Sequence, residues 1–260
     1  MNGRLERMEI EALFAQTLHG EYDDDEPWKA VSVLQQIGSR EVFDQAALWC
    51  RTDDPLKRAC GADILAQFGK TAEHPQNTYP DECFVITADI ATTEESCLPL
   101  RSAIHALGHI GDPRAVPIIA KHSTDSDPDM RFAVACACGS FGNEELAVNV
   151  LLNLMRDDDS DVRDWATFGL GSMSDSDTPT IRNALFDALN DSDADVRQEA
   201  QIGLAKRQDT RVLPHLFALL QEPEVDDLTI EAACLMLHLP NANPDWGPND
   251  YHAALRQQLA

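Results

Sequence analysis

The sequence is poor in basic residues, in aromatic residues and in long apolar runs. Only 20 of its 260 residues are Lys or Arg, against 45 Asp or Glu, so the formal net charge at pH 7 is −25. This excess of negative charge repels the phosphates of nucleic acids and of anionic membranes, and it attracts basic protein surfaces. We therefore expect no nucleic-acid partner, no membrane partner, and a protein partner that is basic. The same charge also serves solubility alone, and that interpretation stays open.

We also expect no signal peptide, no membrane-spanning segment and no disulfide framework. Charged residues such as Arg4, Glu6 and Arg7 interrupt the N-terminal segment, where a signal peptide would be apolar. No segment approaches the roughly 20 apolar residues that cross a bilayer. The seven cysteines are an odd number without framework spacing, and most lie in apolar helical patterns. They indicate reduced core residues of a cytoplasmic protein.

Motifs that carry catalysis are missing as well. The sequence has no Gly-rich phosphate loop, no nucleophile elbow and no Cys-x-x-Cys. His105 and His109 are four residues apart on a predicted helix and share a face, but the sequence indicates no third metal ligand. Cys136 and Cys138 point to different faces of a helix and suit core positions better than a redox pair. We expect no catalytic residue, no metal and no cofactor.

What the sequence does contain is an internal repeat. Aromatic residues make up only 6% of the chain, so aliphatic side chains must fill the core. Asp161-Val162-Arg163 and Asp195-Val196-Arg197 begin two copies of one unit, and each copy continues into a small-residue segment, a turn and an apolar run. Arg163 and Arg197 are 34 residues apart. A fixed period in the thirties, built from two short helices, predicts a helical solenoid.

The same unit can be followed along the whole chain, which predicts one continuous domain over residues 1–260. A helix over 4–19 is expected to cap the open end of the array. Seven helix pairs follow, and an irregular loop over 71–79 interrupts the second. The predicted helices are 27–37 and 40–51, 53–69 and 80–91, 97–111 and 112–123, 128–141 and 144–156, 160–172 and 178–190, 194–206 and 209–221, and finally 226–239 and 249–260.

The segment from Ala106 to Pro117 carries a resemblance to a known family. Its sequence, ALGHIGDPRAVP, is similar to the HEAT-like repeats, in the subgroup named after phycobilisome lyases. The pattern recurs across nearly the whole chain, although Leu100 departs from it at a position where the other repeats have Arg. The resemblance implies an all-α, right-handed α-α superhelix of the HEAT or armadillo type. The matching residues of the repeated motif are Arg58, Arg131, Asp161, Arg163, Asp195 and Arg197.

We assign structural roles to this motif. The Asp before each first helix is expected to accept hydrogen bonds from free backbone N–H groups. The Arg two residues after Asp161 and after Asp195 is expected to reach the acidic turn of the next repeat, which would make a ladder of ion pairs. The Asp runs at 157–161 and 191–195 lack the Gly and the closing Glu of a calcium loop, and therefore predict capped turns.

The resemblance also indicates a binding surface, because the second helices of HEAT-like arrays line the concave face. Aligning these helices brings five polar residues to the exposed side. A row of this kind suits a protein-binding groove, and it is equally typical of a solvated helix face. The row consists of Lys121, Asn149, Asn153, Asp187 and His215.

Protein binding without catalysis is the function that these observations favour, and we expect a monomer. The segment from Asp161 to Glu222 is similar to bacterial HEAT-like proteins regarded as immunity partners of Rhs-type polymorphic toxins. Nuclease toxins are commonly basic, so an acidic inhibitor would associate fast with one. The resemblance leaves two alternatives open. One is a lyase or chromophore-attachment factor, with a ligand near 71–79 or Trp246, and the other is a general scaffold.

Two other HEAT-like activities are disfavoured. The deoxyhypusine hydroxylases bind iron through His-Glu dipeptides, and this chain contains no such dipeptide. HEAT-like DNA glycosylases use a basic face, which the acidic balance of this chain does not provide.

Overall fold

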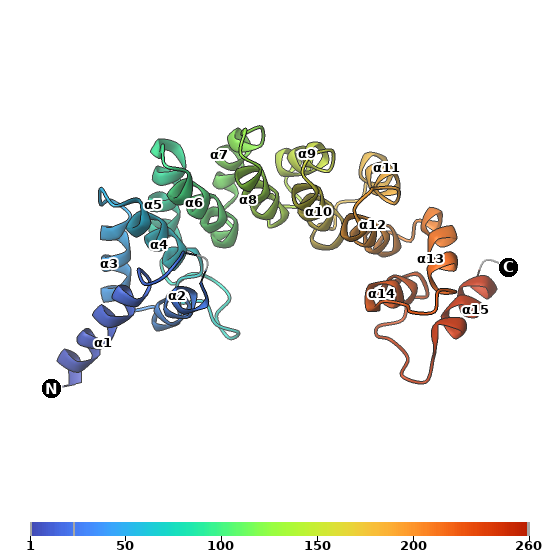
Figure 1. Ribbon diagram of the computed structural model, residues 1–260, viewed down its shortest axis with the longest axis horizontal. Helices are drawn as coiled ribbons and strands as arrows, with labels where there is room; N and C mark the ends of the chain where they lie inside the picture. The colour runs from blue at the N-terminus through green and yellow to red at the C-terminus, as the bar shows by residue number, and fades with distance from the viewer. Residues whose placement is uncertain (1, 23, 259–260) are drawn as a thin grey trace. The chain divides into compact units, whose positions relative to one another are not determined.

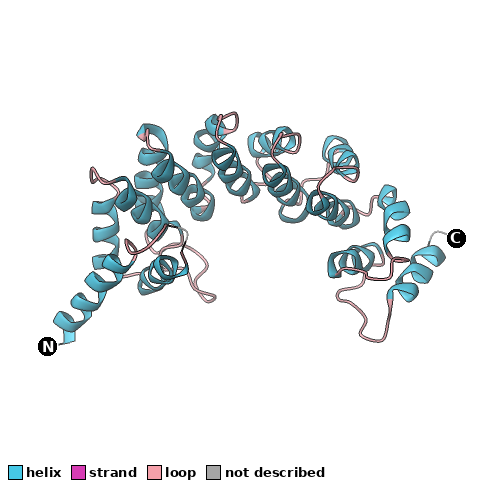
Figure 2. Ribbon diagram, in the orientation of Figure 1, coloured by secondary structure: helices cyan, strands magenta, loops and turns pink. Residues whose placement is uncertain are grey.

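The computed structural model describes residues 2–22 and 24–258, with the side chains of residues 2–7 left out. In these ranges every regular element is a helix and no strand occurs (Figure 2). The predicted all-α solenoid class is confirmed. The chain divides into two compact units, Met1–Ser140 and Phe141–Ala260. The single domain over 1–260 stays a prediction.

The N-terminal unit begins with a cap helix and continues into helix pairs (Figure 1). Phe14 on the cap helix packs edge-on against Trp49, with ring centroids 4.8 Å apart, so the helix covers the first pair as expected. The predicted helix over 112–123 is broken into short helical turns, because Pro113 begins one turn and Pro117 lies at the start of the next. The helices are α1 (Asn2–Gln16), α2 (Asp25–Ile37), α3 (Arg40–Trp49), α4 (Pro55–Ala66), α5 (Pro80–Thr93), α6 (Cys97–Ile110), η1 (Pro113–Ala115), α7 (Val116–Ile119), η2 (Ala120–His122) and α8 (Pro128–Gly139).

The C-terminal unit continues the same alternation. The predicted helix over 160–172 is α-helical only to residue 168 and then widens into a π-helix, η3. The last helix was predicted to residue 260, and residues 259–260 lie outside the described part. The helices are α9 (Glu145–Leu154), α10 (Ser160–Phe168), η3 (Gly169–Met173), α11 (Pro179–Ala188), α12 (Ala194–Lys206), η4 (Thr210–Val212), α13 (Leu213–Leu219), α14 (Asp227–Met236) and α15 (Pro248–Gln258). No helix within residues 2–22 and 24–258 combines the length and the apolar character needed to cross a membrane.

Each unit has two layers of helices. The first helices of successive pairs pack on one another, as α4, α6 and α8 in the N-terminal unit and as α10, α12 and α14 in the C-terminal unit. We call these helices the first-helix layer. The second helices of the pairs form what we call the second-helix layer, which packs against one side of the first-helix layer in each unit (Figure 1). They are α5 and α7 in the N-terminal unit and α9, α11 and α13 in the C-terminal unit. Aliphatic and small residues fill the space between the layers.

The acidic turns start the first helices. Asp159 accepts hydrogen bonds from two backbone N–H groups at the start of α10, and Asp193 does the same at the start of α12. These caps stand two residues before the Asp161 and Asp195 of the repeated motif, which lie in the first helical turn near the positive end of the helix dipole. Both Asp runs thus form capped turns.

Ion pairs join neighbouring repeats along one edge. The Arg163 guanidinium forms two bonds of 2.9 Å with the Asp191 carboxylate, which lies in the turn before the next first helix. The Arg58 guanidinium holds the Glu94 carboxylate in the same way, at 2.6 and 2.9 Å. Both pairs are largely buried, so water screens them little. Such paired hydrogen bonds fix the orientation of one repeat on the next.

Arg131, Arg163 and Arg197 each also donate to backbone carbonyls of the turn before their own helix. Among the described residues Arg197 forms no ion pair with the turn that follows, so the expected ladder is wrong at this link. In the repeat that has Leu100 in place of Arg, the next residue forms the ion pair to the following repeat. There Arg101 pairs with Asp129 at the start of α8, at 2.6 Å.

The Glu94→Gln variant measures how much one such ion pair contributes to the free energy of unfolding. The hydrogen bonds from Arg58 hold the pKa of the Glu94 carboxyl at about 2, well below its ordinary value. A depressed carboxyl pKa adds stability that is fully present above the unfolded-state value of about 4.3 and is lost as the pH falls toward the folded pKa. We expect Glu94→Gln to lower the free energy of unfolding by about 2 kcal/mol at pH 7, measured by urea denaturation. At pH 2 the variant and the wild type should differ little.

Glu95→Gln is the matched control, since this neighbour is exposed. It should leave stability within about 0.5 kcal/mol of wild type at both pH values. An equal loss for Glu94→Gln at pH 7 and at pH 2 would contradict the assignment to charge.

The loop over 71–79 is anchored at its C-terminal end. The buried Asn77 side chain donates to the backbone carbonyl of Leu65 at 2.9 Å. The Tyr79 ring packs against Phe43 and Phe68, with centroids 5.0 and 6.1 Å away. The loop is therefore part of the folded N-terminal unit. It holds the C-terminal end of α4 in place, and residues of that end line a cavity.

Candidate functional site

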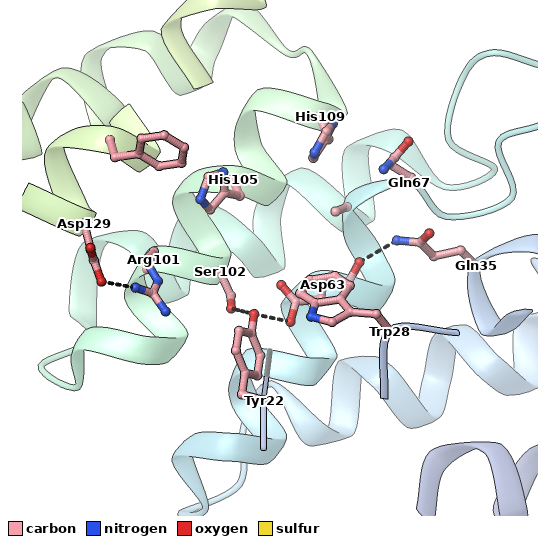
Figure 3. Close-up of a pocket in the computed structure, with 12 residues that line it drawn as sticks. Tyr22, Trp28, Gln35, Asp63, Gln67, Arg101, Ser102, His105, His109 and Asp129 are labelled. Atoms are coloured by element: carbon pink, nitrogen blue, oxygen red, sulfur yellow. Dashed lines mark hydrogen bonds and ion pairs between the residues drawn. The ribbon is translucent and has the colours of Figure 1, made fainter. Parts of the chain in front are cut away.

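The N-terminal unit contains a cavity of about 410 Å³ on its first-helix layer (Figure 3). Four helices and the turn before α2 contribute to it. Their lining positions recur every three or four residues, as on α6, so each helix presents one face. The lining residues are Tyr22, Trp28, Gln35, Asp63, Ala66, Gln67, Arg101, Ser102, His105, His109, Asp129 and Phe132.

A buried carboxyl, that of Asp63 on α4, belongs to this cavity. The side chain is only 5% exposed. The Tyr22 hydroxyl donates to Asp63 Oδ2 at 2.8 Å and lies 2.9 Å from the Ser102 hydroxyl, as Figure 3 shows. The Gln35 side chain donates to the backbone carbonyl of Asp63 at 2.8 Å and ties α2 to α4. Two neutral hydroxyl groups thus hold the carboxyl in place.

Burial changes the protonation of this cluster. It raises the pKa of the Asp63 carboxyl to about 7, and the hydrogen bonds from Tyr22 and Ser102 and the charge of Arg101 offset this only in part. Burial and the nearby Asp63 carboxyl also raise the pKa of the Tyr22 hydroxyl far above its ordinary value. Tyr22 therefore stays a donor, while Asp63 changes its charge near neutral pH.

The two histidines on α6 are uncharged at neutral pH. Burial, with smaller contributions from the charges of His109 and Arg101, lowers the pKa of His105 to about 4. Desolvation and the charge of Lys70 lower the pKa of His109. The His105 ring meets Phe132 edge-on at 6.4 Å. This side of the cavity is therefore polar and carries no charge.

The rest of the lining is aromatic or already paired. Trp28 is 38% exposed, and its ring meets the Tyr22 ring edge-on with centroids 5.6 Å apart. The Arg101 guanidinium pairs with Asp129 at 2.6 Å. A positive charge near the cavity is thus matched by a carboxylate, whereas the Asp63 carboxyl has no ion-pair partner among the described residues.

This arrangement is suited to binding. No hydrogen bond joins His105 or His109 to Ser102 in the described chain, so the cavity lacks the Ser–His pair of a nucleophilic site. No group of three or more His, Cys, Asp or Glu side chains within residues 2–22 and 24–258 has the geometry to hold a metal ion. A buried carboxyl whose pKa lies near 7, in an aromatic cavity, accepts either a proton or a cationic group.

The C-terminal unit has unneutralised negative charge on its first-helix layer. Asp164 on α10, Glu199 on α12 and Glu231 on α14 form what we call the acidic row. Burial and then the carboxylates of Asp195, Asp193 and Asp161 raise the pKa of Asp164 to about 6. Burial raises the pKa of Glu199, and the charges of Asp164 and Glu231 add to the effect. No Lys or Arg in the described residues forms an ion pair with a member of the row.

The residues predicted to bind a partner lie on the other layer. Four of them are exposed, and the fifth, His215, is partly buried with a ring nitrogen that has no hydrogen-bond partner. One of the five belongs to the N-terminal unit and four to the C-terminal unit. Their contact with a partner stays a prediction. They are Lys121 in η2, Asn149 and Asn153 on α9, Asp187 on α11, and His215 on α13.

Sequence reasoning identified neither the cavity nor the acidic row. The four-residue spacing of His105 and His109 suggests only a pair of metal ligands, whereas the structure places both side chains in the cavity lining. The signal that was available is Asp63, a carboxylate inside the otherwise apolar and small-residue stretch from Cys60 to Ala66. An acid at a buried helical position is rare unless it is paired, and it marks a candidate site.

The chain is similar to known proteins both in sequence and in structure. A sequence profile described as HEAT repeats matches residues 88–171 and 148–237. The protein YibA of Escherichia coli strain K12 is 31% identical over 220 residues, which cover 81% of this chain and 76% of YibA. The X-ray structure of YibA matches with a TM-score of 0.70 at 26% identity, over 96% of this chain and 91% of that one.

A more distant likeness concerns the lyase alternative. The complex of CpcE and CpcF of phycocyanin lyase from Nostoc sp. PCC7120 gives a TM-score of 0.45 at 18% identity, over 90% of this chain and 83% of that chain. A likeness at this level carries no argument about activity.

Proposed function

The chain belongs to the HEAT-repeat family, and on that premise we propose that it is a non-catalytic module that binds a basic protein. HEAT-repeat arrays generally mediate protein interactions, because stacked repeats offer an extended surface with few constraints on its side chains. The acidic row carries the proposal. Burial and neighbouring carboxylates raise the pKa of Asp164 and of Glu199, and no described Lys or Arg forms an ion pair with either. A partner that supplies a cation would therefore stabilise their charged forms.

A finer proposal concerns the partner. We place it among the basic polymorphic toxins, with this chain acting as the immunity protein, as a monomer in the bacterial cytoplasm. The net charge of −25 supports this, since it would steer a basic toxin into a fast encounter. The seven free cysteines, five of them buried, suit a reducing compartment.

Affinity capture from the native host tests the proposal. The bait is the full chain, either wild type or the variant Asp164→Asn, Glu199→Gln, Glu231→Gln, and retained proteins are identified by mass spectrometry at low and at high salt. We expect wild type to retain one dominant basic protein, released by salt. The triple variant should bind it roughly 10- to 100-fold more weakly, chiefly through a slower association rate.

The control variant removes the same number of charges from the second-helix layer, by Glu144→Gln, Glu145→Gln and Asp187→Asn. It should retain the partner almost as well as wild type. If the control loses the partner and the acidic-row variant keeps it, the second-helix row that includes Asp187 is the interface. Retention of the partner by both variants at wild-type strength would overturn a charge-based interface altogether.

The lyase alternative predicts a different outcome of the same capture. A pigment or other chromophore would copurify with the bait, and no basic protein would be enriched. The cavity is lined by Gln67 of the segment just before the 71–79 loop, but by no residue of that loop and not by Trp246. Neither the 71–79 loop nor Trp246, where the sequence suggested a ligand, therefore lines this cavity.

A further inference from the structure

We infer that the cavity of the N-terminal unit binds the guanidinium group of an arginine side chain, which anchors the basic partner to this unit. The inference rests on the proposed function for the source of the arginine. It rests on the geometry of the cavity for the chemistry of the site. The acidic row lies in the other unit, so the two sites can be tested separately.

The need for a cation comes from Asp63. An ionised carboxylate has about four acceptor positions, and burial makes its charge costly unless an opposite charge lies close. Here the hydrogen bonds come from the hydroxyl groups of Tyr22 and Ser102, which are neutral. The positive charge that acts on Asp63 is that of Arg101, and Asp129 holds this guanidinium at 2.6 Å. A cation that enters the cavity would supply the charge that Asp63 lacks.

The aromatic lining fits a flat cation. Trp28 stands partly exposed on α2, with the Tyr22 ring edge-on to it at 5.6 Å. Both rings line the cavity with Asp63, and Figure 3 shows the Tyr22 hydroxyl at the Asp63 carboxyl. Phe132 contributes a third ring, from α8. A cation placed over the face of a Trp or Tyr ring is attracted by the ring electrons, most strongly where water is excluded. The lining therefore combines a carboxylate with rings, which is how proteins hold organic cations.

Several observations favour guanidinium over other cations. Its planar fork matches a carboxylate and stacks on aromatic rings, and it is less strongly hydrated than an ammonium group. His105 and His109 are uncharged at neutral pH and do not repel it. A volume of about 410 Å³ is in the range of organic-ligand sites. A metal ion is not favoured, because the described residues offer no set of three ligands.

The site also predicts a pH dependence. Asp63 faces the hydroxyls of Tyr22 and Ser102, and the charges of Arg101, Cys50 and Cys60 interact with it. Burial raises the pKa of the Cys50 and Cys60 thiols to about 12 and that of the Tyr22 hydroxyl far above its ordinary value, whereas the pKa of Asp63 is about 7. His105, also in the cavity, is already neutral above pH 5. Binding of a guanidinium requires the ionised carboxylate, so affinity should rise between pH 6 and pH 8.

The probe is N-acetyl-arginine methylamide, titrated into the full chain and followed by calorimetry and by the indole N–H signal of Trp28. The uncharged citrulline analogue is the comparator. We expect saturable binding with a Kd on the order of 1 mM for a ligand of this size. Binding should be several-fold tighter at pH 8 than at pH 6, and the citrulline analogue should bind at least about tenfold more weakly.

Two variants test the assignment of residues. Asp63→Asn keeps the shape of the side chain and removes its charge, and it should weaken binding at least about tenfold and abolish the pH dependence. Trp28→Leu replaces a partly exposed ring, so the fold should be kept, and it should weaken binding several-fold. Glu145→Gln, at an exposed position of the other unit, should bind the probe like wild type. Equal binding by wild type and Asp63→Asn overturns the site.

The outcomes also separate this inference from the proposed function. If a basic partner is captured through the acidic row but the arginine probe does not bind, the cavity inference alone is wrong. If the probe binds and no basic partner is captured, the proposed function is wrong and the guanidinium site remains. If agmatine binds while the blocked arginine does not, the assignment to a protein side chain is overturned.

Discussion

Replacing Arg207 by Met should lower the free energy of unfolding of the C-terminal unit by about 4 kcal/mol, the largest effect we expect from a single substitution. Arg207 is 8% exposed and stands just after α12. Its guanidinium forms no ion pair with a carboxylate of the described residues and donates instead to backbone carbonyls, at distances from 2.7 to 3.2 Å. These carbonyls belong to Leu170, Gly171, Ser174, Ser176 and Gly203.

The physical reason lies in the π-helix η3, after which the chain leaves the helix. Carbonyls at the end of a helix have no partner inside it, and here Arg207 supplies the partner. Methionine fills a similar volume but donates nothing, so several buried acceptors would be left unpaired, and each costs about 1 to 3 kcal/mol before water or local rearrangement relieves it. Desolvation lowers the pKa of Arg207, but a guanidinium stays charged at all relevant pH values.

Urea denaturation combined with amide hydrogen exchange checks this prediction. Exchange should become faster over residues 169–176, while the N-terminal unit keeps wild-type protection. Arg156→Met is the matched control, because Arg156 is exposed in the same unit, and it should cost less than about 0.5 kcal/mol. A cost for Arg207→Met no larger than that of the control would mean that the carbonyls find other donors.

Gly203→Val should destabilise the same unit by about 3 kcal/mol. A Cβ atom on Gly203 would lie 2.7 Å from the Cα of Gly171 and 3.0 Å from both methyl groups of Leu185. The first of these contacts is with backbone, so α12 and η3 would have to move apart. Overpacking of this kind usually costs 1 to 3 kcal/mol, and backbone contact puts it at the upper end.

Ala218→Val provides the comparison, since Ala218 is an exposed residue of α13. It introduces the same β-branched side chain into a helix and should cost about 0.5 kcal/mol. Gly203→Ala should fall between the two, because it adds one methyl group. Thermal unfolding of the three variants should give this order, and a Gly203→Val variant as stable as Ala218→Val would contradict the close approach.

The helices could be predicted from sequence because local residues determine them. Asp159 and Asp193 start their helices through hydrogen bonds to residues two or three positions ahead. The Pro residues at Pro55, Pro80 and Pro128 mark helix starts equally plainly. Helix bounds therefore agree with prediction to within a few residues in most pairs. In η3, where they differ, the distant Arg207 donates to the carbonyls of Leu170 and Gly171, and the local sequence does not indicate this contact.

The cavity could not be predicted in the same way. Tyr22 meets Asp63 and Ser102 across 41 and 80 residues of sequence. Nothing in the pattern around any one of them indicates the others. The acidic row has the same character, since its three carboxylates come from three different helices and the local pattern of each helix does not indicate the other two. Periodicity identifies which face of a helix is apolar, and it does not identify which polar residues of stacked helices meet.

The acidic turns have a consequence for the synthesis of the chain. In three of them a backbone N–H bonds to the Asp carboxylate two residues earlier, as Asp127 does to Asp125, Asp159 to Asp157 and Asp193 to Asp191. None of these bonds requires any later part of the chain. A 34-residue repeat takes about 2 to 7 s to leave the ribosome. Each turn can therefore form and start its helix while the next repeat is still being translated, so the array can assemble in the order in which it is made.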